Sequence, residues 1–127
     1  MKKMIYTREY KQTILDQGTY KGYDYKIVSY GLHPCAYIEI PKTNKFYNKN
    51  YEYIDINCHG GLTFGDFRDF GDGSKYYLGW DYAHFGDYSG VYMFDMLPHG
   101  KKWKTEEILD EVFIAIDSLI ELENKDA

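Results

Sequence analysis

An alternation of apolar and polar residues with a period of two marks residues 35–40 and residues 51–58. In both segments one face is aliphatic, and the other carries tyrosine and a carboxylate. The aliphatic positions are Ala36, Ile38 and Ile40 in the first segment and Ile54, Ile56 and Cys58 in the second. This period is typical of half-buried strands. The pattern predicts a sheet with one face toward the core and the other toward a ligand or a partner.

Further strands and loops follow from composition. Strands are expected where tyrosine and β-branched residues gather between turn residues, at residues 20–30, 76–82 and 91–97. Mixed charges before Gly18 favour a short helix over residues 9–16. Two segments rich in Lys, Asn, Gly and Asp are expected to be loops, residues 42–50 and 65–74.

A helix over residues 106–122 is the best-defined element. Thr105 is a suitable N-cap, and Glu106 and Glu107 suit the positive end of the helix dipole. Seven apolar residues recur at helical spacing, namely Ile108, Leu109, Val112, Phe113, Ile116, Leu119 and Ile120. Ile114 alone projects among acidic residues on the other side. We therefore expect one α+β domain over residues 1–127, an antiparallel sheet of about five strands with this C-terminal amphipathic helix packed on its aliphatic face.

Composition narrows the classes of partner. The net charge of −5 disfavours direct binding to nucleic acid, which needs clustered cations. Cys35 and Cys58 lack metal-binding spacing and are expected to be buried free thiols, in keeping with a reducing compartment. No apolar run has membrane-spanning length, and the N-terminus lacks the apolar stretch of a signal peptide. We expect a protein of the cytoplasm that has no membrane partner.

Two short segments, 58–64 and 77–88, combine glycine with histidine, aspartate and aromatic residues. Glycine lets backbone approach a ligand closely, and convergent polar groups give a site its specificity. The expected ligand-binding residues are His59, Gly60, Gly61, Thr63, Trp80, Asp81, Tyr82, His84 and Asp87.

The same two segments support a catalytic site less well than a binding site. The His59-Gly60-Gly61 turn resembles an esterase oxyanion hole, but the chain has no G-x-S-x-G nucleophile elbow. His59 and His84 with Asp81 and Asp87 are suitable metal ligands, although their spacing matches no strong metal motif. The acidic residues of segment 65–74 lack the closing glutamate of an EF-hand, and no P-loop is present. No cofactor is expected.

The aromatic residues near these glycines suggest a nucleotide-derived ligand. Tyrosine and tryptophan rings stack on nucleobases, and they also anchor protein interfaces. Few cations are available for phosphate groups, and the candidates are Arg68, Lys75, Lys101, Lys102 and Lys104.

Several motifs resemble a family of small proteins from phages and prophages of Gram-positive bacteria. They are HPCAYIEIP at 33–41, IDINCHGGLTF at 54–64, YLGWDYAHFGDY at 77–88 and W-x-x-E-x-I-x-x-E-V from Trp103. The resemblance implies an accessory phage gene that counters bacterial immunity. Such proteins bind and block, or sequester a nucleotide signal, more often than they catalyse.

Three functional hypotheses remain open. The first is a non-enzymatic binder that counters host defence by sequestering a nucleotide-derived signal molecule. The second is a direct protein inhibitor of a defence nuclease, acting through an acidic and aromatic surface. The third is a metal-dependent hydrolase that uses His59, Asp81 and His84. Ile114 would mark the contact if the chain forms a homo-oligomer.

Overall fold

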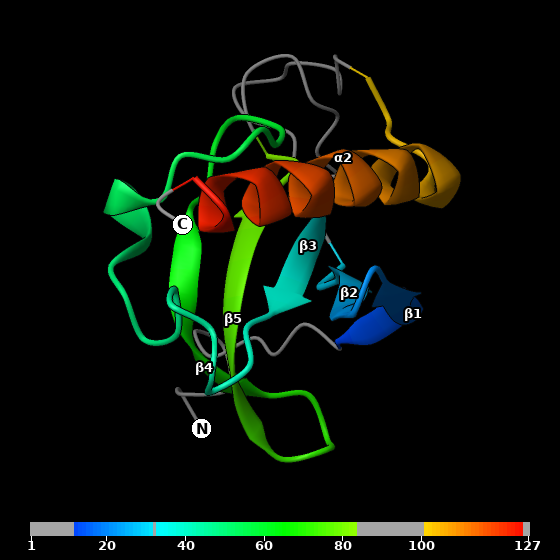
Figure 1. Cartoon of the computed structure of the whole chain (residues 1–127). Helices are drawn as coiled ribbons and strands as arrows, with labels where there is room; N and C mark the ends of the chain where they lie inside the picture. The colour runs from blue at the N-terminus through cyan, green and yellow to red at the C-terminus, as the bar shows by residue number, and fades with distance from the viewer. Residues whose placement is uncertain (1–11, 32, 84–100, 126–127) are drawn as a thin grey trace.

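A five-stranded antiparallel sheet with one long helix across it forms the fold (Figure 1). The structure is a computed structural model, and it describes residues 12–31, 33–83 and 101–125. The strands are β1 (Thr13–Tyr20), β2 (Tyr23–Ser29), β3 (Pro34–Glu39), β4 (Phe64–Asp69) and β5 (Ser74–Asp81), in the order β1-β2-β3-β5-β4. The other elements are the 3-10 helix η1 (Tyr51–Tyr53) and the helix α2 (Thr105–Glu123). The predicted α+β class is confirmed.

The inner face of the sheet packs against α2 and forms the main core. On the helix the completely buried residues are Ile108, Val112, Ala115, Ile116 and Leu119. On the strands they meet Ile27, Ala36, Ile38, Leu78 and Trp80. The predicted aliphatic face of β3 and the predicted helix stripe both lie in this core. The period of two in the strand and of about 3.6 in the helix each place the apolar residues on one side of the element. Ile114 is 51% exposed, as expected from its place outside the stripe.

The outer face of the sheet carries a second, smaller core made largely of aromatic residues. Its buried members are Val28, Cys35, Tyr37 and Tyr77, with Ile14, Tyr30, Phe64 and Phe70 packed beside them. Tyr37 and Glu39 share this face, so the predicted tyrosine-and-carboxylate side of β3 is confirmed. Buried Cys35 is a free thiol, whereas Cys58, also free, is only partly buried.

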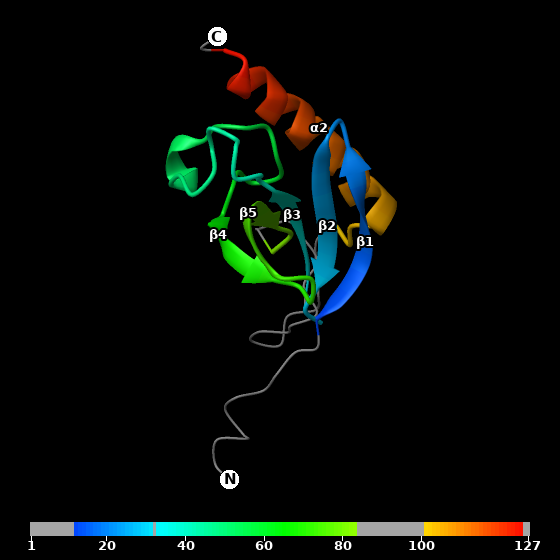
Figure 2. The same cartoon turned by 60° about the horizontal axis from the view of Figure 1, so that its bottom comes forward.

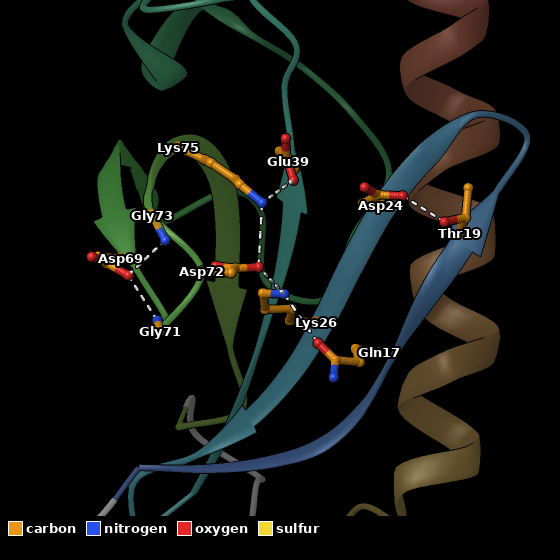
Figure 3. A network of polar contacts seen from close by, with 10 residues as sticks. All are labelled: Gln17, Thr19, Asp24, Lys26, Glu39, Asp69, Gly71, Asp72, Gly73 and Lys75. Carbon is orange, nitrogen blue, oxygen red and sulfur yellow. Dashed lines mark hydrogen bonds and ion pairs between the residues drawn. The ribbon is translucent and has the colours of Figure 1, made fainter.

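The outer face ends in a polar rim that ties the β4–β5 turn to the rest of the sheet (Figure 3). Asp72 in this turn lies 3.3 Å from both Lys26 of β2 and Lys75 of β5. Lys75 also lies 3.8 Å from Glu39 of β3. These two lysines are therefore already paired with carboxylates.

Both edge strands differ from the sequence expectation (Figure 2). Residues 13–16, expected in a helix, belong to β1, because a two-residue turn at Lys21 and Gly22, both with positive φ, folds this segment back onto β2. Segment 65–74, expected to be a loop, is most of β4 plus a tight turn. Asp69 Oδ1 accepts hydrogen bonds from the backbone N–H groups of Gly71 and Gly73 and so closes that turn.

Two other expectations are wrong in detail. Residues 51–58 form η1 and an irregular segment instead of a strand, although Ile54 and Ile56 do face the core. The helix N-cap is Lys104, not Thr105, and the Glu107 side chain accepts the Lys104 N–H at 3.0 Å. The expected strand at 91–97 lies outside the described residues. Within the described ranges, no helix is long and apolar enough to cross a membrane.

Candidate functional site

The His59-Gly60-Gly61 segment forms a tight turn at the edge of the core. The Gly61 N–H donates to the Cys58 carbonyl at 3.1 Å, and both glycines have positive φ, 70° and 85°. Side chains other than glycine rarely adopt this conformation. Just before the turn, the Asn57 N–H donates to the Ser118 hydroxyl at 2.9 Å, which fixes the segment to α2.

Three aromatic rings from distant parts of the chain meet at this turn. The His59 ring stacks on Tyr82, with centroids 4.6 Å apart and planes 8° from parallel. Trp103, just before α2, lies 5.0 Å from His59 and 5.1 Å from Tyr82. We call His59, Tyr82 and Trp103 the ring cluster. Stacked and edge-on arrangements at these distances are favourable for aromatic side chains.

Hydrogen bonds hold the Tyr82 ring in place. The Trp80 indole donates to the Tyr82 hydroxyl at 3.1 Å, and that hydroxyl donates to Glu111 of α2 at 2.5 Å. Burial and the bond to Glu111 raise the pKa of Tyr82, so the hydroxyl remains a neutral donor. Trp80 and Tyr82 are 1% and 0% exposed. Both were expected among the ligand contacts, and both lie beneath the surface.

The cation Lys101 lies beside the ring cluster. The Lys101 ammonium group sits 3.9 Å from the centroid of the Trp103 ring and 3.3 Å from Glu107. The backbone hydrogen bond from Lys104 and the side-chain bond from Lys101 lower the pKa of Glu107. Lys101, one of the cations that the sequence offered for phosphate groups, therefore lies near His59 of the HGG turn, although the two residues are about 40 positions apart in the sequence.

A pocket of about 230 Å³ opens beside His59. Its lining residues are Asn57, Cys58, His59, Glu111 and Ile114. Burial, with Glu111 nearby, raises the pKa of the Cys58 thiol to about 12. The thiol is therefore protonated at neutral pH and is a poor nucleophile.

Thr63 and Asp81 form a separate pair. The Thr63 hydroxyl donates to Asp81 at 3.2 Å, and the second carboxylate oxygen accepts the Ala83 N–H at 3.1 Å. Asp81 stands opposite Cys35 on the outer face, whereas its neighbour Tyr82 belongs to the inner core. The structure thus brings His59 to Tyr82, but it does not bring His59 and Asp81 together.

The structure describes only two of the four ligands of the metal hypothesis. Of its four ligands, His59 and Asp81 project to different sides, and His84 and Asp87 lie outside the described residues. Within the described ranges, no three His, Cys, Asp or Glu side chains are close enough to hold a metal ion.

Sequence reasoning did not place Trp103 or Glu111 in the site. Both lie on or next to the C-terminal helix, and only the fold brings them to the HGG turn. The sequence signal for Trp103 was its place among Lys101, Lys102 and Lys104, because a ring between cations suits a ligand with both a base and phosphate.

Comparisons with known protein families, with curated proteins and with solved structures gave no significant match for this chain. The functional argument therefore depends on the geometry of the site.

Proposed function

We propose that this chain is a small non-catalytic binding protein that takes up a nucleotide-derived molecule at the pocket beside His59. One observation carries the proposal: the ring cluster, with Lys101 against its Trp103 ring, lies next to a small pocket. Aromatic faces suit a nucleobase, and a lysine suits a phosphate group.

The pocket size and lining agree with such a ligand. About 230 Å³ is less than a site that encloses a whole drug-sized molecule, so one ring system would enter while the rest stays near the lysines. Glu111 gives one oxygen to Tyr82, and a carboxylate keeps further acceptor capacity for the amino group of a base. The high pKa of Cys58 favours binding over nucleophilic catalysis.

The biological role that we attach to this site is sequestration. A binder that holds a host signal molecule away from its receptor would counter a bacterial defence, as the resemblance to small phage proteins implies. Stoichiometric binding without turnover is enough for this role. The alternative, direct inhibition of a defence nuclease, would use the protein surface instead of the pocket.

The test starts from protein purified from bacterial cells. Native mass spectrometry should reveal a retained small molecule that absorbs near 260 nm, and calorimetry should then measure its rebinding to stripped protein. We expect His59→Ala to weaken binding by about 1–3 kcal/mol, the usual worth of one base-stacking contact. Lys101→Gln should weaken it by less than about 1 kcal/mol, because Lys101 is exposed.

Tyr53→Ala is the matched control, because Tyr53 is 87% exposed and lies outside the ring cluster. It should bind as the unchanged protein does. If the His59 variant bound the ligand as tightly as the unchanged protein does, binding at the pocket would be refuted. Chemical conversion of the retained molecule during incubation would favour the hydrolase, and a co-purifying nuclease in its place would favour the direct inhibitor.

A further inference from the structure

A single arginine on the outer face, away from the pocket beside His59, is surrounded by aromatic rings. The Cζ atom of Arg68 lies 5.4–5.8 Å from four ring centroids, those of Phe64, Tyr30, Phe70 and Tyr37. The rings come from β3, β4, the β4–β5 turn and the residue after β2. The face of an aromatic ring attracts a cation such as a guanidinium group.

The position of Arg68 is fixed by Tyr37. A Cβ atom on Gly79 would lie 2.7 Å from Cδ1 of Tyr37, so this ring packs closely against the glycine of β5. Its hydroxyl accepts a hydrogen bond from Arg68 Nη1 at 3.3 Å and shares another with Tyr30 at 2.9 Å. Burial, with the bond to Tyr30, raises the pKa of Tyr37 and keeps the hydroxyl neutral.

Arg68 differs from the other cations of this face. Lys75, directly opposite Arg68 on β5, pairs with Asp72 and Glu39, and Lys26 pairs with Asp72 (Figure 3). Among the described residues, the one hydrogen bond of Arg68 goes to the neutral Tyr37 hydroxyl, and no carboxylate pairs with it. A guanidinium group has five N–H donors, so most of them remain for another acceptor.

We propose that Arg68 is the receptor for an oxyanion, a phosphate or carboxylate group of a small ligand, at a second site on the outer face. Among the described residues only the Tyr37 hydroxyl accepts from the guanidinium, and the remaining N–H donors of such a group can bind two oxygens side by side. The choice of residue supports this, because the chain has thirteen lysines but only two arginines, Arg8 and Arg68.

The presence of only two arginines makes a direct test possible. In a nitrogen-15-labelled sample, each arginine gives one side-chain Nε–Hε signal, and Arg8→Lys assigns them. The protein is titrated with inorganic phosphate and, separately, with acetate. We expect the Arg68 signal to shift and to saturate with at least one of the two anions. The anion that binds more tightly identifies the ligand group.

The variants separate a receptor from a packing residue. Arg68→Met keeps the contacts with the rings but should weaken anion binding at least tenfold. In this variant, binding is measured from the backbone amide signals of residues near Tyr37. Arg68→Lys keeps the charge and should weaken it at least threefold. Lys75→Met removes the same charge from the paired position and should change the affinity less than twofold.

Three outcomes would overturn the proposal. The first is a linear, unsaturable shift with both anions. The second is affinity in Arg68→Lys equal to that of the unchanged protein. The third is an equal loss of affinity in the Lys75 and Arg68 variants. None of these depends on the pocket beside His59, so the two proposals fail separately.

Discussion

At the scale of single residues, tyrosine hydroxyl groups join the core to its surroundings. Tyr23 accepts from Asn44 at 2.6 Å and donates to Glu123 of α2 at 2.6 Å, and Tyr76 donates to the Lys49 carbonyl at 2.5 Å. Each ring buries apolar area in the core while its hydroxyl reaches a loop or the helix. Tyr23 and Tyr76 thus belong to the core and also connect it to a loop or to the helix.

Tyr82 and Tyr77 differ in one respect, which predicts opposite effects of the same substitution. The Tyr82 hydroxyl bonds to Trp80 and Glu111, whereas the buried Tyr77 hydroxyl has no partner among the described residues. Tyr82→Phe should destabilise the fold by about 1–3 kcal/mol, since it leaves the buried Trp80 N–H without its acceptor and removes a donor from the partly buried Glu111 carboxylate. Tyr77→Phe should be neutral or slightly stabilising. Urea denaturation of both variants checks this, and equal losses would contradict it.

At the scale of elements, α2 is held to the sheet by one stripe of side chains. Ile116 is 0% exposed within this stripe, and Ile114, two residues earlier, is 51% exposed beside the pocket. The same residue type therefore occupies two contrasting environments on one helix.

This contrast gives a paired prediction for the helix. Ile116→Ala should lower the free energy of unfolding by about 2–5 kcal/mol, because it leaves a cavity in the core. Ile114→Ala should change it by less than about 0.5 kcal/mol, as expected for a surface site. Denaturant melts measure both. A small effect at Ile116 would mean that the helix is peripheral, and a large one at Ile114 would point to a contact between chains.

The elements predictable from the sequence were the well-buried ones, which are rich in apolar and aromatic residues. The central strands β3 and β5 are buried on both faces and the helix α2 along one stripe, and all three were predicted. The edge strands β1 and β4 were missed, because they are more exposed and polar and depend on pairing with a neighbour. In the candidate site, His59 and Tyr82 come from the two segments that the sequence singled out, whereas Trp103 and Glu111 join it only through long-range packing.

At the scale of the whole molecule, the sheet separates two cores of different composition. The inner core under α2 is mainly aliphatic with some aromatic residues, and the outer core is largely aromatic and has a cysteine. The pocket beside His59 lies at the edge of the first core, and Arg68 lies over the second. The two sides of the sheet thus present two chemically different surfaces.

The stability of the whole molecule should fall at alkaline pH. Burial raises the pKa of Cys35 to about 11 and that of Cys58 to about 12, from an ordinary value of 9.0. Above about pH 9 the unfolded thiols lose protons that the folded ones retain, so the free energy of unfolding decreases as pH rises toward the folded values. The raised pKa values of buried tyrosines act in the same direction above about pH 10.

Urea denaturation at intervals from pH 7 to pH 9.5 measures this slope before tyrosine contributes strongly. The double variant Cys35→Ala with Cys58→Ala should start less stable and show a flatter decline. A decline that is equally steep without either thiol would contradict the assignment.

The placement of the two tryptophans gives the protein its own pair of optical reporters. Trp80 is 1% exposed in the core, so its fluorescence should be blue-shifted and should change mainly on unfolding. Trp103, between His59 and Lys101, should respond to a stacked base by quenching. Since the chain has no third tryptophan, Trp103→Phe leaves a pure folding signal. Occupancy of the pocket and integrity of the core can therefore be followed separately in an unlabelled sample.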